Sequence, residues 1–194
     1  MKTDKLSVEK NFELISQVIT QARNRFEENG FIYLFWGLLN ALTSLGQFIL
    51  LQKEYYAISW YPYLLMPIGG VFTIFYFRKK KGKRQGNQIA KIVSYGWLFL
   101  AINMFVVAFV FFPTLKENLI PVTLILLSVG IFISAIAIKS RLLLFSGILI
   151  NLSAFICFSI KWIYQPLLMS IISIVAVAIP GIILMIQHKK KQNV

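Results

Sequence analysis

Six long, uncharged apolar runs occupy most of this chain: 31–51, 58–77, 92–112, 119–138, 142–160 and 166–187. A helix needs roughly 20 residues to cross the hydrocarbon core of a bilayer, and each run has about that length. Backbone groups in lipid must find their hydrogen bonds within the protein, so only helices or a closed barrel can cross. Because the runs are continuously apolar and do not alternate, the sequence predicts an all-α polytopic integral membrane protein with six transmembrane helices.

The composition supports a membrane protein and excludes several soluble classes. Hydrophobic residues make up 58% of the chain and charged residues 14%, whereas soluble domains have about 45–50% and about 25%. This balance excludes a soluble enzyme, a disordered chain and a disulfide-rich secreted scaffold. Cys157 is the only cysteine, so the chain cannot form an intramolecular disulfide.

The charge distribution predicts the orientation of the chain in the membrane. Of its 20 Lys and Arg residues, 17 precede the first run, separate the second from the third or the fourth from the fifth, or follow the sixth. The opposite side holds only Lys53, Lys116 and Lys161. Under the positive-inside rule, this asymmetry predicts a multi-pass protein of the cell (inner) membrane with both termini in the cytoplasm. We interpret tryptophans near the ends of the runs, such as Trp36 and Trp97, as markers of the membrane interface.

The chain divides into a cytoplasmic amphipathic helix (1–30), a six-helix transmembrane bundle (31–187) and a basic cytoplasmic tail (188–194). In the first part, apolar side chains recur three and four residues apart, which is the period of a helix. These candidates for a membrane or partner face are Val8, Phe12, Ile15, Ile19, Ala22 and Phe26. Such a helix can lie on the inner leaflet. Alternatively, because the spacing is close to a heptad, residues 6–29 dock a cytoplasmic protein or a second copy of the chain.

A basic run between the second and third apolar runs is a candidate surface for anionic lipids at the cytoplasmic face. Each Lys or Arg near such a membrane surface contributes about 1 kcal/mol of attraction. The candidate residues are Arg78, Lys79, Lys80, Lys81, Lys83 and Arg84. Alternatively, these residues serve only to fix the orientation of the chain in the membrane. The run does not favour nucleic acid as a partner, because it contains no aromatic residue and the connection is too short for a recognition element.

The three predicted hairpins resemble one another. Two outer connections share the same spacing from lysine to proline, Lys116–Pro121 and Lys161–Pro166. Each odd-numbered run also carries a glycine and a later asparagine on the same helical face. These pairs are Gly37 with Asn40, Gly96 with Asn103, and Gly147 with Asn151. We interpret them as three parallel two-helix repeats, an arrangement found in some transporters; chance similarity between apolar sequences is the alternative.

No feature of the apolar runs predicts catalysis. They contain no Asp, Glu, Lys, Arg or His, so they lack the ionisable groups that proton relays and ion-coupled pumps use. The chain also has no nucleophile, metal-binding or phosphate-binding motif. We therefore expect a protein that is not an enzyme and that carries no cofactor and no metal.

The amide side chains within the runs form a candidate intramembrane polar cluster: Asn40, Gln47, Asn103 and Asn151. A carboxamide that faces lipid leaves its polar atoms unpaired at a cost of several kcal/mol. We therefore expect the three asparagines to face the bundle interior and to find partners across helices. They either stabilise the packing of the helices or form a shared polar site for a small ligand or ion.

Small residues and a proline predict two further features of the spans. Gly37 with Ala41, and Gly130 with Ser134, have the small-x-x-x-small spacing that allows helices in membranes to approach closely. Pro180 lies within the sixth run and is followed by glycine. Because proline cannot donate the helical hydrogen bond, we expect a kink or a local unwinding there.

The segment Glu28-Asn-Gly-Phe-Ile-Tyr-Leu-Phe-Trp-Gly37, preceded by the amphipathic helix, resembles a group of small uncharacterised bacterial inner-membrane proteins. These proteins pair an N-terminal cytoplasmic helix with a compact multi-span region, and the resemblance covers mainly residues 6–50. In that group the gene often neighbours a small winged-helix regulator. The resemblance therefore implies regulation or sensing, and no functional residues to transfer.

Together these patterns predict a non-enzymatic accessory, sensor or regulatory membrane protein that acts through its cytoplasmic helix. The alternative is a small uncoupled transporter or channel-like permease with a polar site at the bilayer midplane. A water-accessible cavity between the odd-numbered spans would favour the permease.

Overall fold

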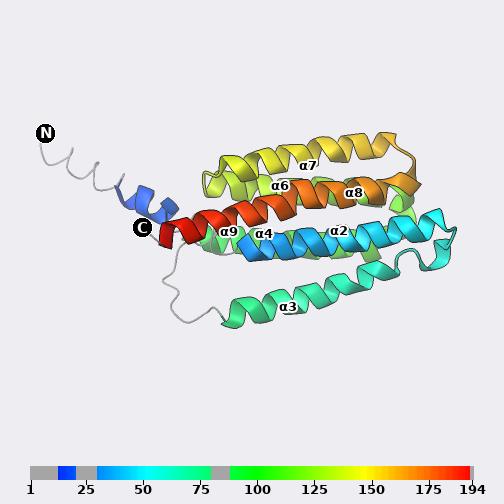
Figure 1. Cartoon of the computed structure of the whole chain (residues 1–194), viewed down its shortest axis with the longest axis horizontal. Helices are drawn as coiled ribbons and strands as arrows, with labels where there is room; N and C mark the ends of the chain where they lie inside the picture. Colours follow the sequence, from blue (N-terminus) through cyan, green and yellow to red (C-terminus); the bar gives the residue numbers. More distant parts are fainter. Residues whose placement is uncertain (1–12, 21–29, 80–87, 193–194) are drawn as a thin grey trace, which may run out of the picture.

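The computed structural model describes residues 13–20, 30–79 and 88–192. Within these ranges the chain is helical and contains no strand, which confirms the predicted all-α class. Six helical stretches are long and apolar enough to cross a membrane, namely Gly30–Gln52, Tyr56–Lys79, Lys91–Phe109, Phe112–Ala137, Arg141–Ser159 and Trp162–Lys190. They lie side by side in one elongated bundle (Figure 1). The number and the approximate positions of the predicted spans are therefore confirmed.

The α-helices are α2 Gly30–Gln52, α3 Leu65–Lys79, α4 Gln88–Phe109, α5 Phe112–Leu115, α6 Leu119–Ala137, α7 Arg141–Ser159, α8 Gln165–Ser173 and α9 Ile179–Gln192. Short 3₁₀ turns connect them at η1 Tyr56–Ile58, η2 Tyr61–Leu64, η3 Lys116–Asn118 and η4 Trp162–Tyr164. The second span therefore begins with two 3₁₀ turns, the second of which starts around Pro62, and becomes α-helical only at Leu65. At the other end of the bundle, α9 continues as a helix into the basic tail as far as Gln192.

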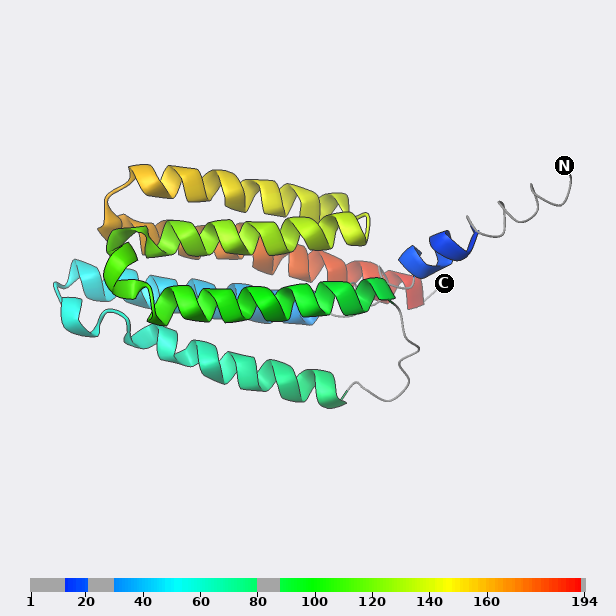
Figure 2. The same cartoon turned by 180° about the vertical axis from the view of Figure 1, so that it is seen from behind.

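The six spans contact one another in the order α3, α2, α8–α9, α7, α6, α4. Buried apolar side chains of α6, α7 and α8–α9 form the core, including Leu124, Ile131 and Ile150. The helices α3 and α4 stand at the two ends of this order of contacts and are the least buried. In Figure 2, α4 runs in front of α2, with α3 below it. Only 6% of the most apolar stretch of α4 and 11% of that of the second span is buried, against 56% of the last span.

Glycines bring the first and last spans into backbone contact. A Cβ atom added to Gly37 would lie 2.5 Å from the backbone N of Ala178, and one added to Gly181 would lie 2.5 Å from the backbone N of Leu34. Neither position has room for a larger residue unless the helices separate. The close packing expected of Gly37 is confirmed, and the helix that it contacts is the last one in the chain.

The last span changes its helical hydrogen bonding just before Pro180. It runs as α8, then as a π-helical turn over Ile174–Ala178, and then as α9. Proline lacks the N–H that would bond the carbonyl four residues earlier, and its ring clashes with that carbonyl. A π-helical turn is one way in which a helix absorbs such an interruption. The predicted local disruption is therefore confirmed, and it takes the form of this turn.

Two helices, α2 and α6, end in a Schellman motif whose left-handed residue is not glycine. After α6, the N–H of Ser140 bonds the carbonyl of Ala135 (2.9 Å) and the N–H of Lys139 bonds that of Ile136 (3.2 Å). This is the Schellman pattern, and it places Lys139 at a φ of 52°. The end of α2 has the same pattern, with Glu54 at a φ of 62°.

Candidate functional site

Two of the three asparagines within the spans, Asn40 and Asn151, hydrogen-bond a serine on a neighbouring helix. The Nδ2 of Asn40 on α2 donates to the Oγ of Ser173 on α8 at 2.6 Å. The Nδ2 of Asn151 on α7 donates to the Oγ of Ser128 on α6 at 3.1 Å. Each serine in turn donates to a carbonyl of its own helix, those of Met169 and Ile125. Both amides therefore have the cross-helix partners expected of groups that stabilise helix packing.

Asn103 departs from this expectation. Its Nδ2 donates to the carbonyl of Phe99 in its own helix at 2.8 Å, so the predicted partner on another helix is wrong for this residue. The physical reason is the position of α4, which packs on α6 through the face that carries Trp97 and Leu100. Asn103 lies about 120° from Trp97 and about 60° from Leu100 around the helix, at the edge of this face.

The four amides do not assemble into one site. Within the described residues, no hydrogen bond joins any two of Asn40, Gln47, Asn103 and Asn151. The buried Oε1 of Gln47 has no hydrogen-bond partner in this part of the chain. The predicted cluster is therefore corrected to two separate interhelical bonds and two amides without a cross-helix bond.

A repeated set of contacts, which the sequence analysis missed, joins the helices of the first two hairpins. The indole Nε1 of Trp36 on α2 donates to the Oγ1 of Thr73 on α3 at 3.0 Å. The Nε1 of Trp97 on α4 donates to the Oγ of Ser134 on α6 at 2.9 Å. The tryptophan and its hydroxyl partner are 37 residues apart in both pairs. The tryptophans that were interpreted as interface markers thus also bind their neighbouring helices.

Glycines complete the equivalence of the two hairpins. A Cβ on Gly69 would lie 2.5 Å from Leu39 and 3.5 Å from the ring of Trp36. A Cβ on Gly130 would lie 2.6 Å from Leu100 and 3.3 Å from the ring of Trp97. The four residues that make these contacts in the first hairpin therefore have counterparts 61 residues later in the second. The pairs are Trp36 and Trp97, Leu39 and Leu100, Gly69 and Gly130, and Thr73 and Ser134.

These contacts correct the predicted repeat. It is present in the α2–α3 and α4–α6 hairpins, but it is carried by tryptophan, leucine, glycine and a hydroxyl, and the glycine–asparagine pairs do not carry it. The third hairpin lacks these contacts because α7 contains no tryptophan. A search for repeats at a fixed offset of 61 residues would have found the signal in the sequence.

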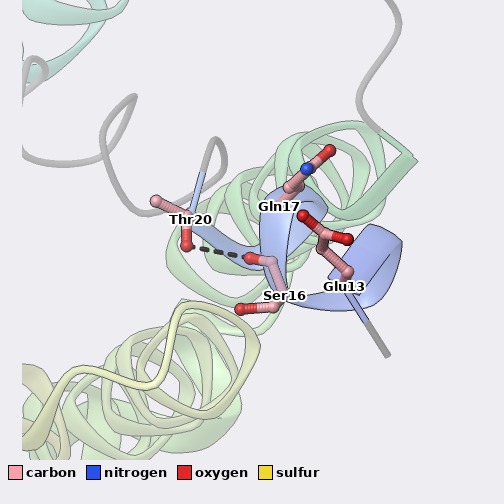
Figure 3. Close-up of a pocket in the computed structure, with 4 residues that line it drawn as sticks. All are labelled: Glu13, Ser16, Gln17 and Thr20. Atoms are coloured by element: carbon pink, nitrogen blue, oxygen red, sulfur yellow. Dashed lines mark hydrogen bonds between the residues drawn. The ribbon is translucent and has the colours of Figure 1, made fainter. Parts of the chain in front are cut away.

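Residues 13–20 form a short helical segment near the end of α9 (Figure 1). A surface depression of about 290 Å³ is lined by Glu13, Ser16, Gln17 and Thr20. Figure 3 shows these four side chains on two consecutive turns, with the hydroxyl of Thr20 donating to the carbonyl of Ser16 at 2.8 Å. Among the described residues, this one short helix alone lines the depression.

Apolar side chains occupy the other side of the same segment. Leu14 is 58%, Ile15 56% and Val18 37% exposed, and Ile19 is half-buried. By helical geometry these four lie opposite the polar side chains of Figure 3. The other predicted members of this face, Val8, Phe12, Ala22 and Phe26, lie outside the described residues.

The structure describes only the start of the basic run. Arg78 and Lys79 are exposed at the end of α3. Lys80, Lys81, Lys83 and Arg84 lie outside the described residues. In the described part of the chain, no three His, Cys, Asp or Glu side chains come close enough together to hold a metal ion.

Comparison of the chain with protein-family models, with curated proteins and with solved structures gives no match. Function must therefore be inferred from the contacts and exposed surfaces of the chain itself.

Proposed function

We propose that this protein is a non-enzymatic membrane component that binds a cytoplasmic protein through its N-terminal helix. The observation that carries the proposal is the exposure of Leu14, Ile15 and Val18 on a helical segment at the end of the bundle, near the end of α9. These side chains fall within an arc of about 100° around the helix, as the apolar face of an amphipathic helix does. Apolar faces of this kind are buried against a partner helix, a groove or a membrane surface.

The proposed location of this helix is the cytoplasmic side of the cell (inner) membrane. An even number of spans and the charge distribution both support this location. The exposed Arg78 and Lys79 at the end of α3 then face anionic lipid headgroups. In a Cys157→Ser background, a cysteine at Lys116 should react with a membrane-impermeant maleimide in intact cells, whereas a cysteine at Gly82 should not. The reverse labelling would overturn this topology.

A photo-crosslinking amino acid tests the binding face directly. We expect p-benzoylphenylalanine at Ile15 to crosslink to a cytoplasmic protein in intact cells. Gln17, on the polar side of the same turn, is the matched control and should give no such product. Crosslinks from Ile15 to lipid alone would refute the protein partner and assign the helix to the surface of the inner leaflet. Equal crosslinking from both positions would also refute the proposal, because no face would then be preferred.

The duplicated hairpins favour a second candidate, a small uncoupled permease. Parallel repeats occur in transporter folds, and α2–α3 and α4–α6 share one set of contacts. Swelling of proteoliposomes in isosmotic glycerol, followed by light scattering, tests this candidate. Swelling no faster than that of empty liposomes argues against a pathway for small uncharged solutes. Faster swelling that Asn151→Leu abolishes, while that variant stays folded at the assay temperature, would favour the permease.

A further inference from the structure

The equivalence of the first two hairpins shows where α4 departs from its counterpart α2. With the offset of 61 residues, Asn103 corresponds to Leu42 and Gly96 corresponds to Phe35. Leu42 is 66% exposed, as expected of a leucine that faces lipid. The fold itself therefore accepts an apolar residue at this position, and the amide of Asn103 is not needed to build the hairpin.

The departure at Gly96 lies on the same face of α4. Phe35 in the first hairpin fills the space beside α3, where its ring centroid lies 4.7 Å from that of Phe72. At Gly96, an added Cβ would meet nothing within 4 Å. Gly96 and Asn103 are seven residues apart, so they lie within about 20° of each other on the helix. One face of α4 thus combines an open glycine, which permits a close approach, with an amide.

Among the described residues, most of the polar atoms of Asn103 have no hydrogen-bond partner. Within the described part of the chain, its one hydrogen bond runs from Nδ2 to the carbonyl of Phe99. Its Oδ1 atom and its second N–H group form no hydrogen bond with the described residues. They lie on the least buried helix of the bundle, three residues from Leu100, which is at the middle of the span Lys91–Phe109. Polar groups at this depth in lipid are costly unless another protein group bonds them.

We propose that two copies of this chain associate through α4, with Gly96 at the helix crossing and the Asn103 amides bonded to each other. All copies have the same orientation in the membrane, so a parallel pair of α4 helices places the two Asn103 side chains at the same depth. A carboxamide is self-complementary, because it offers both a donor and an acceptor to its own copy. An isologous interface requires this self-complementarity. A single Asn in an otherwise apolar seam is also the device that sets register and partner number in coiled coils.

Cysteine crosslinking in native membranes tests the interface. In a Cys157→Ser background, Phe99→Cys and Val106→Cys lie on the Gly96–Asn103 face and should form intermolecular disulfides with copper phenanthroline. Leu98→Cys and Phe105→Cys lie at nearly the same depths on the far face and are the matched controls. Leu98 (57%) and Phe105 (58%) are exposed, as Phe99 is (67%), whereas Val106 is half-buried. If Leu98→Cys and Phe105→Cys form disulfides to the same extent as Phe99→Cys and Val106→Cys, the proposal is overturned.

Association in proteoliposomes tests the role of the amide. Energy transfer between labelled copies, titrated against lipid, should show that Asn103→Leu weakens dimerisation by about 3- to 30-fold, the range expected for one interhelical hydrogen bond in a membrane. Asn103→Gln should retain most of the association. The melting temperature of the Asn103→Leu monomer should be unchanged, because Leu42 occupies the equivalent position. A chain that stays monomeric at every protein-to-lipid ratio, or a dimer unaffected by Asn103→Leu, would overturn the proposal. Since the proposed interface lies on the lipid-facing side of α4, either result leaves the proposed partner of the N-terminal helix untouched.

Discussion

Replacing Gly37 by alanine tests whether the first and last spans are held by direct backbone contact. The new Cβ would lie 2.5 Å from the backbone N of Ala178 and 2.8 Å from both its Cα and its Cβ. Favourable contacts between carbon atoms require about 3.5–4.0 Å. Backbone atoms cannot rotate away as a side chain can, so α2 must move about 1 Å from α9 and the preceding π-helical turn.

The expected cost has two parts. Overpacking of a close contact costs about 1–3 kcal/mol. Separating the helices also lengthens two neighbouring hydrogen bonds, from Asn40 to Ser173 (2.6 Å) and from Ser170 to the carbonyl of Ala41 (2.9 Å). Such bonds contribute about 0.6 kcal/mol each on average in membrane proteins. We therefore expect Gly37→Ala to lower the free energy of unfolding by about 2–3 kcal/mol.

The chain carries its own probe for this measurement. Cys157 is the only cysteine and is fully buried, so a thiol-reactive fluorophore reports unfolding of the detergent-solubilised protein. A loss of about 2–3 kcal/mol corresponds to a fall of about 4–12 °C in melting temperature for a chain of this size. Gly70→Ala is the matched control, because its Cβ would meet nothing within 4 Å. Equal melting temperatures for Gly37→Ala and Gly70→Ala would refute the close approach of α2 to the last span.

Three further predictions use the same melting assay. Trp36→Phe and Trp97→Phe should each lower stability by about 1 kcal/mol, because each removes one indole–hydroxyl bond of the duplicated hairpins; a loss from only one of them would contradict their equivalence. Lys139→Gly should raise stability by about 1 kcal/mol, because the φ of 52° strains any residue with a Cβ; an unchanged melting temperature would show that this strain is absent. Asn151→Leu should cost about 1 kcal/mol or more, because it leaves the buried Ser128 without the amide; a stability equal to that of the unmodified chain would contradict the bond.

The spans could be predicted from the sequence because a single dominant force determines them. Transfer of an uncharged apolar run of about 20 residues into lipid depends on composition and length. Neither quantity requires knowledge of the neighbouring helices. The exception is the second span, where Pro62 and the residues around it form 3₁₀ turns and delay the α-helix to Leu65. Hydropathy cannot distinguish these two kinds of helical turn.

Helix pairing could not be predicted in the same way. Lipid tails are as apolar as the side chains, so hydrophobicity does not select neighbours within the bilayer. Selection comes from close contacts such as that of Gly37 with Ala178, and from bonds such as that of Trp97 with Ser134. Asn103 shows why the sequence does not determine helix pairing: its position on the helical wheel does not say whether another helix covers that face.

The pairing of the first span with the last has a consequence for the biosynthesis of the chain. Asn40 and Ser173 are 133 residues apart, and the residues between them must be translated before their bond can form. At about 5–20 residues per second, this interval is roughly 7–27 s. During that time Gly37 and Asn40 of the first span lie in the translocon or the bilayer without their final partner, the last span. A nascent chain that stops before its last helix therefore exposes the face of α2 that carries Gly37 and Asn40. Membrane chaperones and proteases can recognise this exposed polar face as a sign of incomplete folding.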